Sequence, residues 1–306
     1  MQTILGAGGV IGDELAKNLT SYTDRIRLVS RNPKKVNDTD ETFAADLTDL
    51  KQVMDAVNGS EVVYLVVGLK YEIKVWRELW PKIMSNTIDA CKKHQSKLVF
   101  FDNVYMYGKV DGIMTEETPV NPCSKKGEVR ARIAEMLLTE IRSGNLNALI
   151  ARAADFYGPN VANSIPEGLI INNYKKGKSA QVFCSDRFKH SYTYTPDAGK
   201  ATAILGNTEK AYGQVWHLPT MKDPMNGKEW ISAFAREFKT DPKYMVLKKW
   251  MIWIFGLFTP VIGELYEMLY QYDRDYIFDS SRFETEFQFK PTPYSEGIKE
   301  SAKVAL

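Results

Sequence analysis

Apolar residues follow two patterns that alternate along the first half of the chain. Short continuous apolar runs are typical of parallel strands buried on both faces, whereas apolar positions three and four residues apart are typical of helices. The expected strands cover residues 3–5, 25–30, 43–47, 61–67, 97–101 and 147–151. The expected helices cover residues 10–19, 49–57, 76–93 and 124–143. We expect the third helix to break or start near Pro81. This alternation predicts an α/β fold with a doubly wound parallel sheet.

The pattern changes from residue 155 onward. Proline-containing loops and shorter helices surround short strands at 181–183, 191–194 and 215–218. In open α/β sheets the ligand binds outside the carboxyl ends of the strands. We therefore expect residues 1–154 to form a nucleotide-binding domain. Residues 155–306 should form mainly a small α/β substrate-binding cap, with some segments returning to the sheet.

Three evenly spaced glycines, Gly6, Gly9 and Gly12, connect the first strand to the first helix. One glycine allows a turn with positive φ, one lets backbone N–H groups approach a pyrophosphate, and one lets helix and strand pack closely. Val10 and Ile11 would begin the helix, and their unpaired backbone amides would contribute to an anion-binding site. A purely structural turn could also require glycines here. Their position between strand and helix favours a Rossmann-type dinucleotide loop.

The end of the second strand indicates which dinucleotide binds. An acid at this position binds the ribose 2′-hydroxyl of NAD, whereas an arginine accommodates the 2′-phosphate of NADP. The chain has Ser30 and Arg31 there and no acid. A guanidinium–phosphate contact contributes about 1.5–3 kcal/mol, enough for a tenfold to hundredfold preference. We therefore expect NADP rather than NAD, the alternative being that Arg31 belongs to an exposed basic turn.

Further residues at strand ends are candidates for cofactor contacts. Asp46 and Leu47 could meet the adenine, although Asp46 could instead cap the next helix. Gly68 would let the cofactor pass close to the backbone after the fourth strand. Asp155 could bind the nicotinamide carboxamide or the substrate, or could cap the following loop.

Composition and charge narrow the functional class. A net charge of +2, with 25% charged residues, gives no reason to expect nucleic acid or an anionic membrane surface as a partner. The three cysteines lie far apart and indicate reduced thiols, and the histidines at 94, 190 and 217 are isolated, so no metal site is expected. The longest apolar run, residues 250–262, is shorter than the roughly 20 residues that span a bilayer. No leader is recognisable, and we expect a cytoplasmic protein.

Several motifs occur in the order of one known superfamily, and the chain resembles an extended short-chain dehydrogenase/reductase, the superfamily that contains the nucleotide-sugar epimerases. The motifs are the glycine loop, Asp46-Leu47, Tyr107-Gly108, Arg152 with Tyr157-Gly158-Pro159, His190 to Tyr194 with Asp197, and Pro291-Thr292-Pro293. The resemblance implies an NAD(P)-dependent enzyme that acts on a small-molecule substrate. Family habit also suggests a homodimer.

The catalytic motif departs from that resemblance. The superfamily uses Tyr-x-x-x-Lys on the helix after the fifth strand, with Ser or Thr at the end of that strand. Residues 121–135 contain no tyrosine. Alignment places Lys126 at the tyrosine, Arg130 at the lysine and Asn103 at the hydroxyl position.

Three hypotheses explain this departure. Lys126 could be the acid/base, because positive neighbours make an ammonium a better acid. Tyr105, two residues past Asn103, could substitute. Alternatively, Lys126 and Arg130 could hold phosphate or ribose without catalysis. The two cations, four residues apart, would repel unless an anion lay between them.

Aromatic residues bear on the substrate. Residues 69–71, with Trp76 and Trp80, could form a lid or simply cover the sheet. The cap contains a stripe of aromatic and methionine residues, which more often belongs to a core or a subunit interface than to a pocket. These residues are Trp250, Met251, Trp253, Phe255, Phe258, Tyr266, Met268, Tyr270 and Tyr272. We expect NADP-dependent reduction or oxidation of a small apolar carbonyl compound or activated alkene. The alternatives are a nucleotide-sugar epimerase or dehydratase and a non-catalytic NADP-binding redox sensor.

Overall fold

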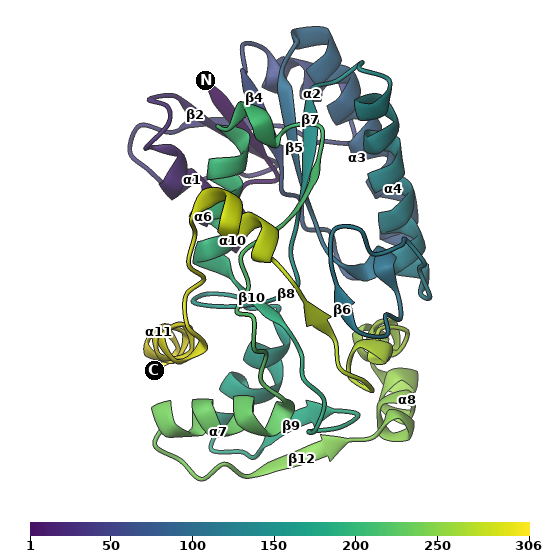
Figure 1. The fold of residues 1–306 in the computed structure, drawn as a ribbon, viewed down its shortest axis with the longest axis vertical. Coiled ribbons are helices and arrows are strands. Elements are labelled where there is room, and N and C mark those ends of the chain that lie inside the picture. Colours follow the sequence, from purple (N-terminus) through teal and green to yellow (C-terminus); the bar gives the residue numbers. More distant parts are fainter. The chain divides into compact units, whose positions relative to one another are not determined.

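The computed structural model describes residues 1–306, which form two compact units (Figure 1). Unit 1 comprises residues 1–106, 126–153 and 198–218. Unit 2 comprises residues 107–125, 154–197 and 219–306. The chain crosses between the units at several places, and one crossing, after residue 153, lies next to the boundary expected at residue 154. Residues 107–125 and 198–218 lie on the other side of it.

Unit 1 is built on one parallel sheet of seven strands in the order β11-β7-β5-β4-β1-β2-β3. The strands are β1 Gln2–Leu5, β2 Ile26–Ser30, β3 Glu41–Ala44, β4 Val62–Leu65, β5 Lys97–Asp102, β7 Ala148–Arg152 and β11 Val215–His217. This order confirms the predicted doubly wound sheet. From β1 the chain adds β2 and β3 on one side of the sheet, and then β4 and the later strands on the other side. Open α/β sheets bind their ligands at such a switch point. The short strand expected at residues 215–218, in the second half of the chain, returns to this sheet as its seventh strand, β11.

Helices cover both faces of this sheet. They are α1 Val10–Leu19, α2 Leu50–Val57, α3 Ile73–His94, α4 Lys125–Arg142 and α6 Thr195–Gly206, with the 3₁₀ turns η1 Tyr105–Tyr107 and η3 Glu209–Ala211. Figure 1 shows α3 and α4 on one face and α1 and α6 on the other. All four residues of β4 are buried, as the continuous apolar run predicts.

Helix α3 differs from its prediction because it continues through Pro81. Proline in a helix interior removes one backbone hydrogen bond and costs about 3 kcal/mol. On both sides of Pro81 the helix buries large side chains, among them Trp76, Trp80 and Ile83. Each fully buried side chain of this kind contributes about 1.5–3 kcal/mol, so packing offsets the cost.

Unit 2 contains three parallel two-stranded sheets. The strands pair as β8 Asp155–Tyr157 with β10 Tyr192–Tyr194, β9 Ala180–Phe183 with β12 Tyr244–Leu247, and β6 Ile113–Met114 with β13 Ile277–Phe278. Its helices are η2 Glu167–Ile171, α5 Asn172–Tyr174, α7 Gly227–Glu237, α8 Lys249–Phe258, α9 Pro260–Tyr266, η4 Leu269–Gln271, α10 Ser281–Phe287 and α11 Tyr294–Ala305. Its main core joins Tyr157, Trp230 and Tyr294 through ring contacts of 5.0–5.5 Å. No helix of the chain has both the length and the apolar character needed to cross a bilayer.

The close approach of α6 to α1 provides a test of the packing in unit 1. A Cβ added at Gly199 would lie 2.5 Å from the Cβ and 2.7 Å from the carbonyl carbon of Glu14. Backbone cannot move aside as a flexible side chain can, so we expect Gly199→Ala to lower the free energy of unfolding by about 1–3 kcal/mol. Urea-induced unfolding would measure the change.

Gly168→Ala is the matched control, because no atom lies within 4 Å of a Cβ added there. We expect this control to change the stability by no more than about 0.5 kcal/mol. Equal effects of the two substitutions would contradict the close contact between the helices.

Candidate functional site

The glycine loop adopts the geometry that the sequence predicts. Gly6 has a φ of 94°, and a Cβ there would lie 2.7 Å from the Cα of Val67. Gly6 therefore supplies both the positive φ and a close approach of two strand ends. Gly8, which the spacing argument did not single out, has a φ of 98° and is a second such position.

The N-terminus of α1 is open. Gly9 is the N-cap in an extended conformation with no side-chain cap. No backbone hydrogen bond engages the amides of Val10, Ile11 and Gly12. Three free N–H groups at a helix N-terminus attract an anion through both hydrogen bonding and the helix dipole. This loop can therefore hold a pyrophosphate.

The end of β2 leaves Arg31 available. Its side chain is exposed and makes no hydrogen bond or ion pair. Asp46 is also exposed and accepts hydrogen bonds from the Thr48 amide at 2.9 Å and the Thr48 hydroxyl at 2.8 Å. These hydrogen bonds, with a smaller contribution from Arg31, hold the pKa of Asp46 below its usual value. Both residues lie at the edge where β2 and β3 end.

The alternative that Asp46 caps α2 is wrong, because Asp49 is the N-cap and accepts from the Gln52 amide at 3.0 Å. Leu47 is buried, and its carbonyl accepts from the Asn86 side chain at 3.0 Å. A Cβ added at Gly68, after β4, would meet no atom within 4 Å. Space is therefore open beside the backbone there.

Lys126 is fully buried in the first turn of α4. Its Nζ lies 4.6 Å from the centroid of the Tyr71 ring, a cation–π contact. Tyr71 packs edge-on against Trp76 at 5.7 Å, and Trp76 stacks on Tyr105 at 6.3 Å. We call Tyr71, Trp76, Trp80 and Tyr105 the aromatic cluster. It brings the two candidate proton donors, Lys126 and Tyr105, to one edge of unit 1.

Arg130 lies one turn after Lys126 and is also buried. It donates from Nε and Nη2 to one oxygen of Asp102, at 2.8 and 2.5 Å. The other oxygen of Asp102 accepts from Arg152 at 3.2 and 3.3 Å. The guanidinium of Arg130 also lies over the rings of Trp80, at 4.5 Å, and Phe100, at 5.0 Å.

Asp102, Arg130 and Arg152 therefore form one buried ion cluster at the carboxyl ends of β5 and β7. Asp102, a carboxylate of the chain itself, is therefore an anionic partner of Arg130. An anionic ligand between Arg130 and Lys126 stays a prediction. Asp102 and Arg152 are direct partners in the register of β5 and β7, which periodicity alone does not reveal.

Asn103 has a local structural role. Its side-chain oxygen accepts from the Tyr105 amide at 3.1 Å and so starts the turn η1. This contact orients Tyr105.

Asp155, in unit 2, contacts residues that the sequence argument did not connect with it. One carboxylate oxygen lies 3.0 Å from Nε2 of His190 and accepts from the Tyr272 hydroxyl at 3.0 Å. Nδ1 of His190 lies 3.1 Å from the Gln271 carbonyl, and the Tyr272 ring stacks on the imidazole at 4.7 Å. Both ring nitrogens thus lie within hydrogen-bond distance of an oxygen. The sequence gives no sign of this contact, because 35 residues separate Asp155 from His190.

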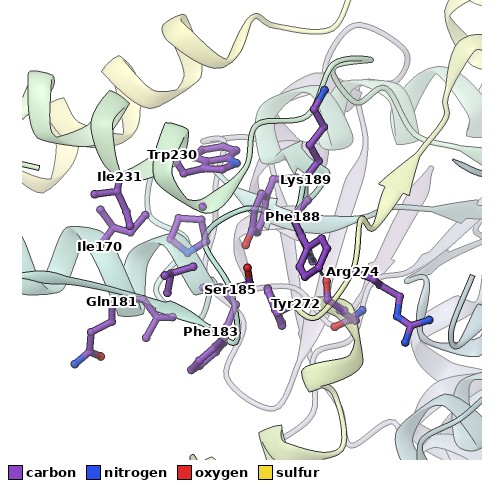
Figure 2. Close-up of a pocket in the computed structure, with 18 residues that line it drawn as sticks. Ile170, Gln181, Phe183, Ser185, Phe188, Lys189, Trp230, Ile231, Tyr272 and Arg274 are labelled. Carbon is purple, nitrogen blue, oxygen red and sulfur yellow. Dashed lines mark hydrogen bonds between the residues drawn. The ribbon is translucent and has the colours of Figure 1, made fainter. Parts of the chain in front are cut away.

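Three members of this group, His190, Gln271 and Tyr272, line a pocket of unit 2 (Figure 2). The pocket has a volume of about 510 Å³, including space open to solvent. The lining is mostly apolar and aromatic, including Ile170, Phe183, Phe188, Trp230 and Ile231. In Figure 2 the charged ends of Lys189 and Arg274 extend away from the centre of the pocket. No group of three His, Cys, Asp or Glu side chains is placed to hold a metal ion.

The sequence matches one known protein family over most of its length. Residues 3–216 match the model of the NAD dependent epimerase/dehydratase family. The chain belongs to this family. The match spans the glycine loop, Lys126 and Arg130, and it confirms the resemblance to extended short-chain dehydrogenase/reductases.

Individual members of the epimerase/dehydratase family are distant from this chain. An uncharacterised UDP-glucose epimerase of Bacillus subtilis is 24% identical over 125 residues, which is 40% of this chain and 40% of that protein. The aligned part thus spans about two fifths of the curated relative. The UDP-glucose 4-epimerase of Thermus thermophilus, solved with NAD, covers 100% of this chain and 99% of its own, with a TM-score of 0.80 and 16% identity. The dTDP-glucose 4,6-dehydratase of Streptomyces venezuelae, solved with NAD, covers 99% of this chain and 96% of its own, with a TM-score of 0.80 and 16% identity.

At these identities the structural likenesses establish the fold of this family member. Family membership makes NAD or NADP the cofactor, and the loop at the start of α1 has the open amides that its pyrophosphate requires.

The buried ion cluster gives a prediction for stability. Asp102→Ala would leave two buried guanidinium groups without their carboxylate. We expect it to lower the free energy of unfolding by about 3–5 kcal/mol, as seen when one partner of a buried ion pair is removed. Chemical denaturation would measure the loss.

Asp241→Ala is the matched control, because the ion pair of Asp241 with Lys243 is exposed, with 76% of each side chain accessible. Exposed pairs contribute at most about 1 kcal/mol. Similar losses for the two variants would show that the buried cluster is not a structural constraint.

Proposed function

We propose that this protein catalyses hydride transfer between NAD(P) and a hydroxyl- or carbonyl-bearing carbon of a small molecule, with Lys126 moving the proton. The observation that carries the proposal is the position of Lys126. It is a fully buried amine at the position where the superfamily has its tyrosine. Burying the charged amine of a lysine costs free energy, and this cost supports a specific task for Lys126.

The proposed proton transfer follows from the groups present. When bound, the nicotinamide supplies the hydride in its reduced form and accepts it in its oxidised form. In the reducing direction the carbonyl carbon receives the hydride and the carbonyl π electrons move to oxygen. The Lys126 ammonium gives that oxygen a proton and becomes a neutral amine. In the oxidising direction the neutral amine takes the hydroxyl proton.

Arg130 supports this role by holding Lys126 in place. Its guanidinium is engaged by Asp102 on one side and by Trp80 and Phe100 on two others. It is therefore a positioning residue for the first turn of α4. Tyr105 remains the alternative proton donor, since its backbone is fixed by Asn103 and its ring by Trp76.

Two substrate classes have support. The apolar lining of the unit 2 pocket, with its charged groups pointing outward, supports a small apolar carbonyl compound. The family and the structural likenesses support a nucleotide sugar more strongly. To bind its diphosphate, Lys189 and Arg274, whose charged ends extend away from the centre of the pocket, would have to turn inward. A non-catalytic NADP sensor stays the third candidate.

Arg31 gives a prediction about cofactor choice. We expect Arg31→Ala to weaken NADPH binding about tenfold to hundredfold and to leave NADH binding nearly unchanged, because only NADPH carries the 2′-phosphate. Titration followed by protein fluorescence would give both dissociation constants. Arg25→Ala is the control, since Arg25 is an exposed arginine at the other end of β2 and pairs with Glu41. Equal binding of both cofactors to wild type would instead favour an NAD enzyme or one that accepts either.

Lys126 gives a prediction about turnover. Wild type would be incubated with NAD(P) and UDP-glucose, UDP-glucuronic acid or dTDP-glucose, and with a panel of apolar carbonyl compounds. Reduced-nicotinamide absorbance detects net redox, and NMR of the sugar detects epimerisation or dehydration. On the substrate found, we expect Lys126→Ala to lower kcat by about 10²–10⁴-fold, the usual contribution of a general acid.

Lys125→Ala is the matched control, because Lys125 is the exposed neighbour on the same helix. A larger loss in Tyr105→Phe than in Lys126→Ala would assign the proton to Tyr105. Tight NADPH binding without turnover on any substrate would favour the sensor.

A further inference from the structure

A hairpin of two short helices in unit 2, α8 and α9, exposes a concentration of large apolar side chains. Figure 1 shows α8 at the end of the segment that leaves strand β12. Phe258, near the tip of the hairpin, is 81% exposed. The other exposed apolar residues of the hairpin are Trp250, Trp253, Ile254, Phe255, Leu257, Val261 and Tyr266.

These side chains cover a broad arc of α8 and the tip of the hairpin, while Met251, Ile252, Ile262 and Leu265 pack against unit 2. Residues 253–255 and 257–261 are all exposed, and Ile252 is the one buried residue of α8. Ile252 packs with Phe183, Leu247 and Leu269, which anchors the base of the hairpin to unit 2. A helix that packs against a protein surface is apolar on one face, whereas a helix that is apolar all round needs an apolar environment on every side.

The backbone of the tip makes most of its hydrogen bonds internally. The Thr259 amide donates to the Phe255 carbonyl, and the Thr259 carbonyl accepts from Ile262 at 2.9 Å and Gly263 at 3.1 Å. Pro260, at the start of α9, has no N–H to satisfy. This matters in lipid, where no water is available for an unpaired amide.

Two glycines bring the helices together. A Cβ added at Gly256 would lie 3.0 Å from the Cα of Gly263. Small residues at such a contact are typical of helix pairs in membranes, where close backbone packing supplies the association energy. The contact holds α8 and α9 together without any side chain between them.

Charged residues flank the apolar part and are absent from it. Residues 250–263 contain none, whereas Lys248 and Lys249 precede them and Glu264 and Glu267 follow. Lys249 pairs with Asp273 at 2.5 Å, and Glu267 accepts from the Lys125 amide at 2.8 Å. The four charges lie at the base and cancel, so electrostatic attraction to lipid headgroups would contribute little.

We propose that this hairpin inserts into one leaflet of a phospholipid bilayer and docks the protein on a membrane surface. At 1.5 Å per residue, α8 is about 15 Å long, half of the roughly 30 Å hydrocarbon core. The hairpin therefore reaches into the membrane and does not span it. The exposed apolar side chains lie on both helices and at the tip between them, an extent that a continuous apolar medium covers better than one flat protein face does.

The tryptophans make the proposal directly measurable. Of the six, Trp76, Trp80, Trp216 and Trp230 are buried, and Trp250 and Trp253 on α8 are 64% and 54% exposed. A change in the exposed-tryptophan emission therefore reports on the hairpin. The probes are vesicles of phosphatidylcholine alone and of phosphatidylcholine with phosphatidylglycerol, each with and without brominated acyl chains.

We expect flotation with both kinds of vesicle, retained in high salt because apolar burial dominates. Emission should shift to shorter wavelength and be quenched by the brominated chains. The variant Leu257→Glu/Phe258→Glu keeps both reporters and should weaken vesicle partitioning about tenfold or more, since each charge would have to enter hydrocarbon. Ile113→Glu/Val120→Glu, at exposed apolar positions of unit 2 outside the hairpin, should bind as wild type does.

Absence of vesicle binding at millimolar lipid would overturn the proposal. So would binding that the Leu257→Glu/Phe258→Glu variant retains. Self-association that this variant abolishes, with no vesicle binding by wild type, would assign the hairpin to a second copy of the chain.

Discussion

The candidate catalytic edge of unit 1 depends on one buried carboxylate, Asp102. Two guanidinium groups, from Arg130 and Arg152, share its two oxygens. Removing three charges from water is expensive, and the arrangement is tolerated only while each charge keeps its partners. Asp102 belongs to β5, Arg152 to β7 and Arg130 to α4. The ion cluster therefore fixes where α4 begins relative to the carboxyl ends of two strands, and with it the position of Lys126.

This edge brings cations and aromatic rings together. The ion cluster contains two cations and one anion, and Lys126 lies one turn from Arg130. Aromatic ring faces compensate in part, since Arg130 lies over Trp80 and Phe100, and Lys126 over Tyr71. In the proposed reaction such a site would favour negative charge as it develops on the substrate oxygen. Under this proposal, cations and aromatic ring faces take the place of the tyrosine that the superfamily uses.

The parts of the structure that the sequence predicted are those with local causes. Continuous apolar runs located strands such as β4 because these strands are buried on both faces. The glycine loop was predictable because positive φ and close approach restrict the residue type at Gly6. The ion cluster joins residues 28 and 50 positions apart, and the Asp155–His190 contact joins residues 35 apart. Such contacts depend on register and tertiary packing, to which a periodic pattern is insensitive.

The hairpin of α8 and α9 illustrates a different limit of sequence interpretation. Its aromatic and methionine residues were expected in the core or at a subunit interface. Met268 and Tyr270, which follow the hairpin, are indeed buried, but Trp250, Trp253 and Phe258 are exposed. A run without polar residues has no polar face, so it gives no sign of which side is covered. The net charge of the chain bears on its attraction to anionic surfaces. The length of an apolar run bears on whether it can cross a bilayer. Neither bears on shallow insertion, which depends on the apolar area that a locally folded hairpin can place beyond its charged base.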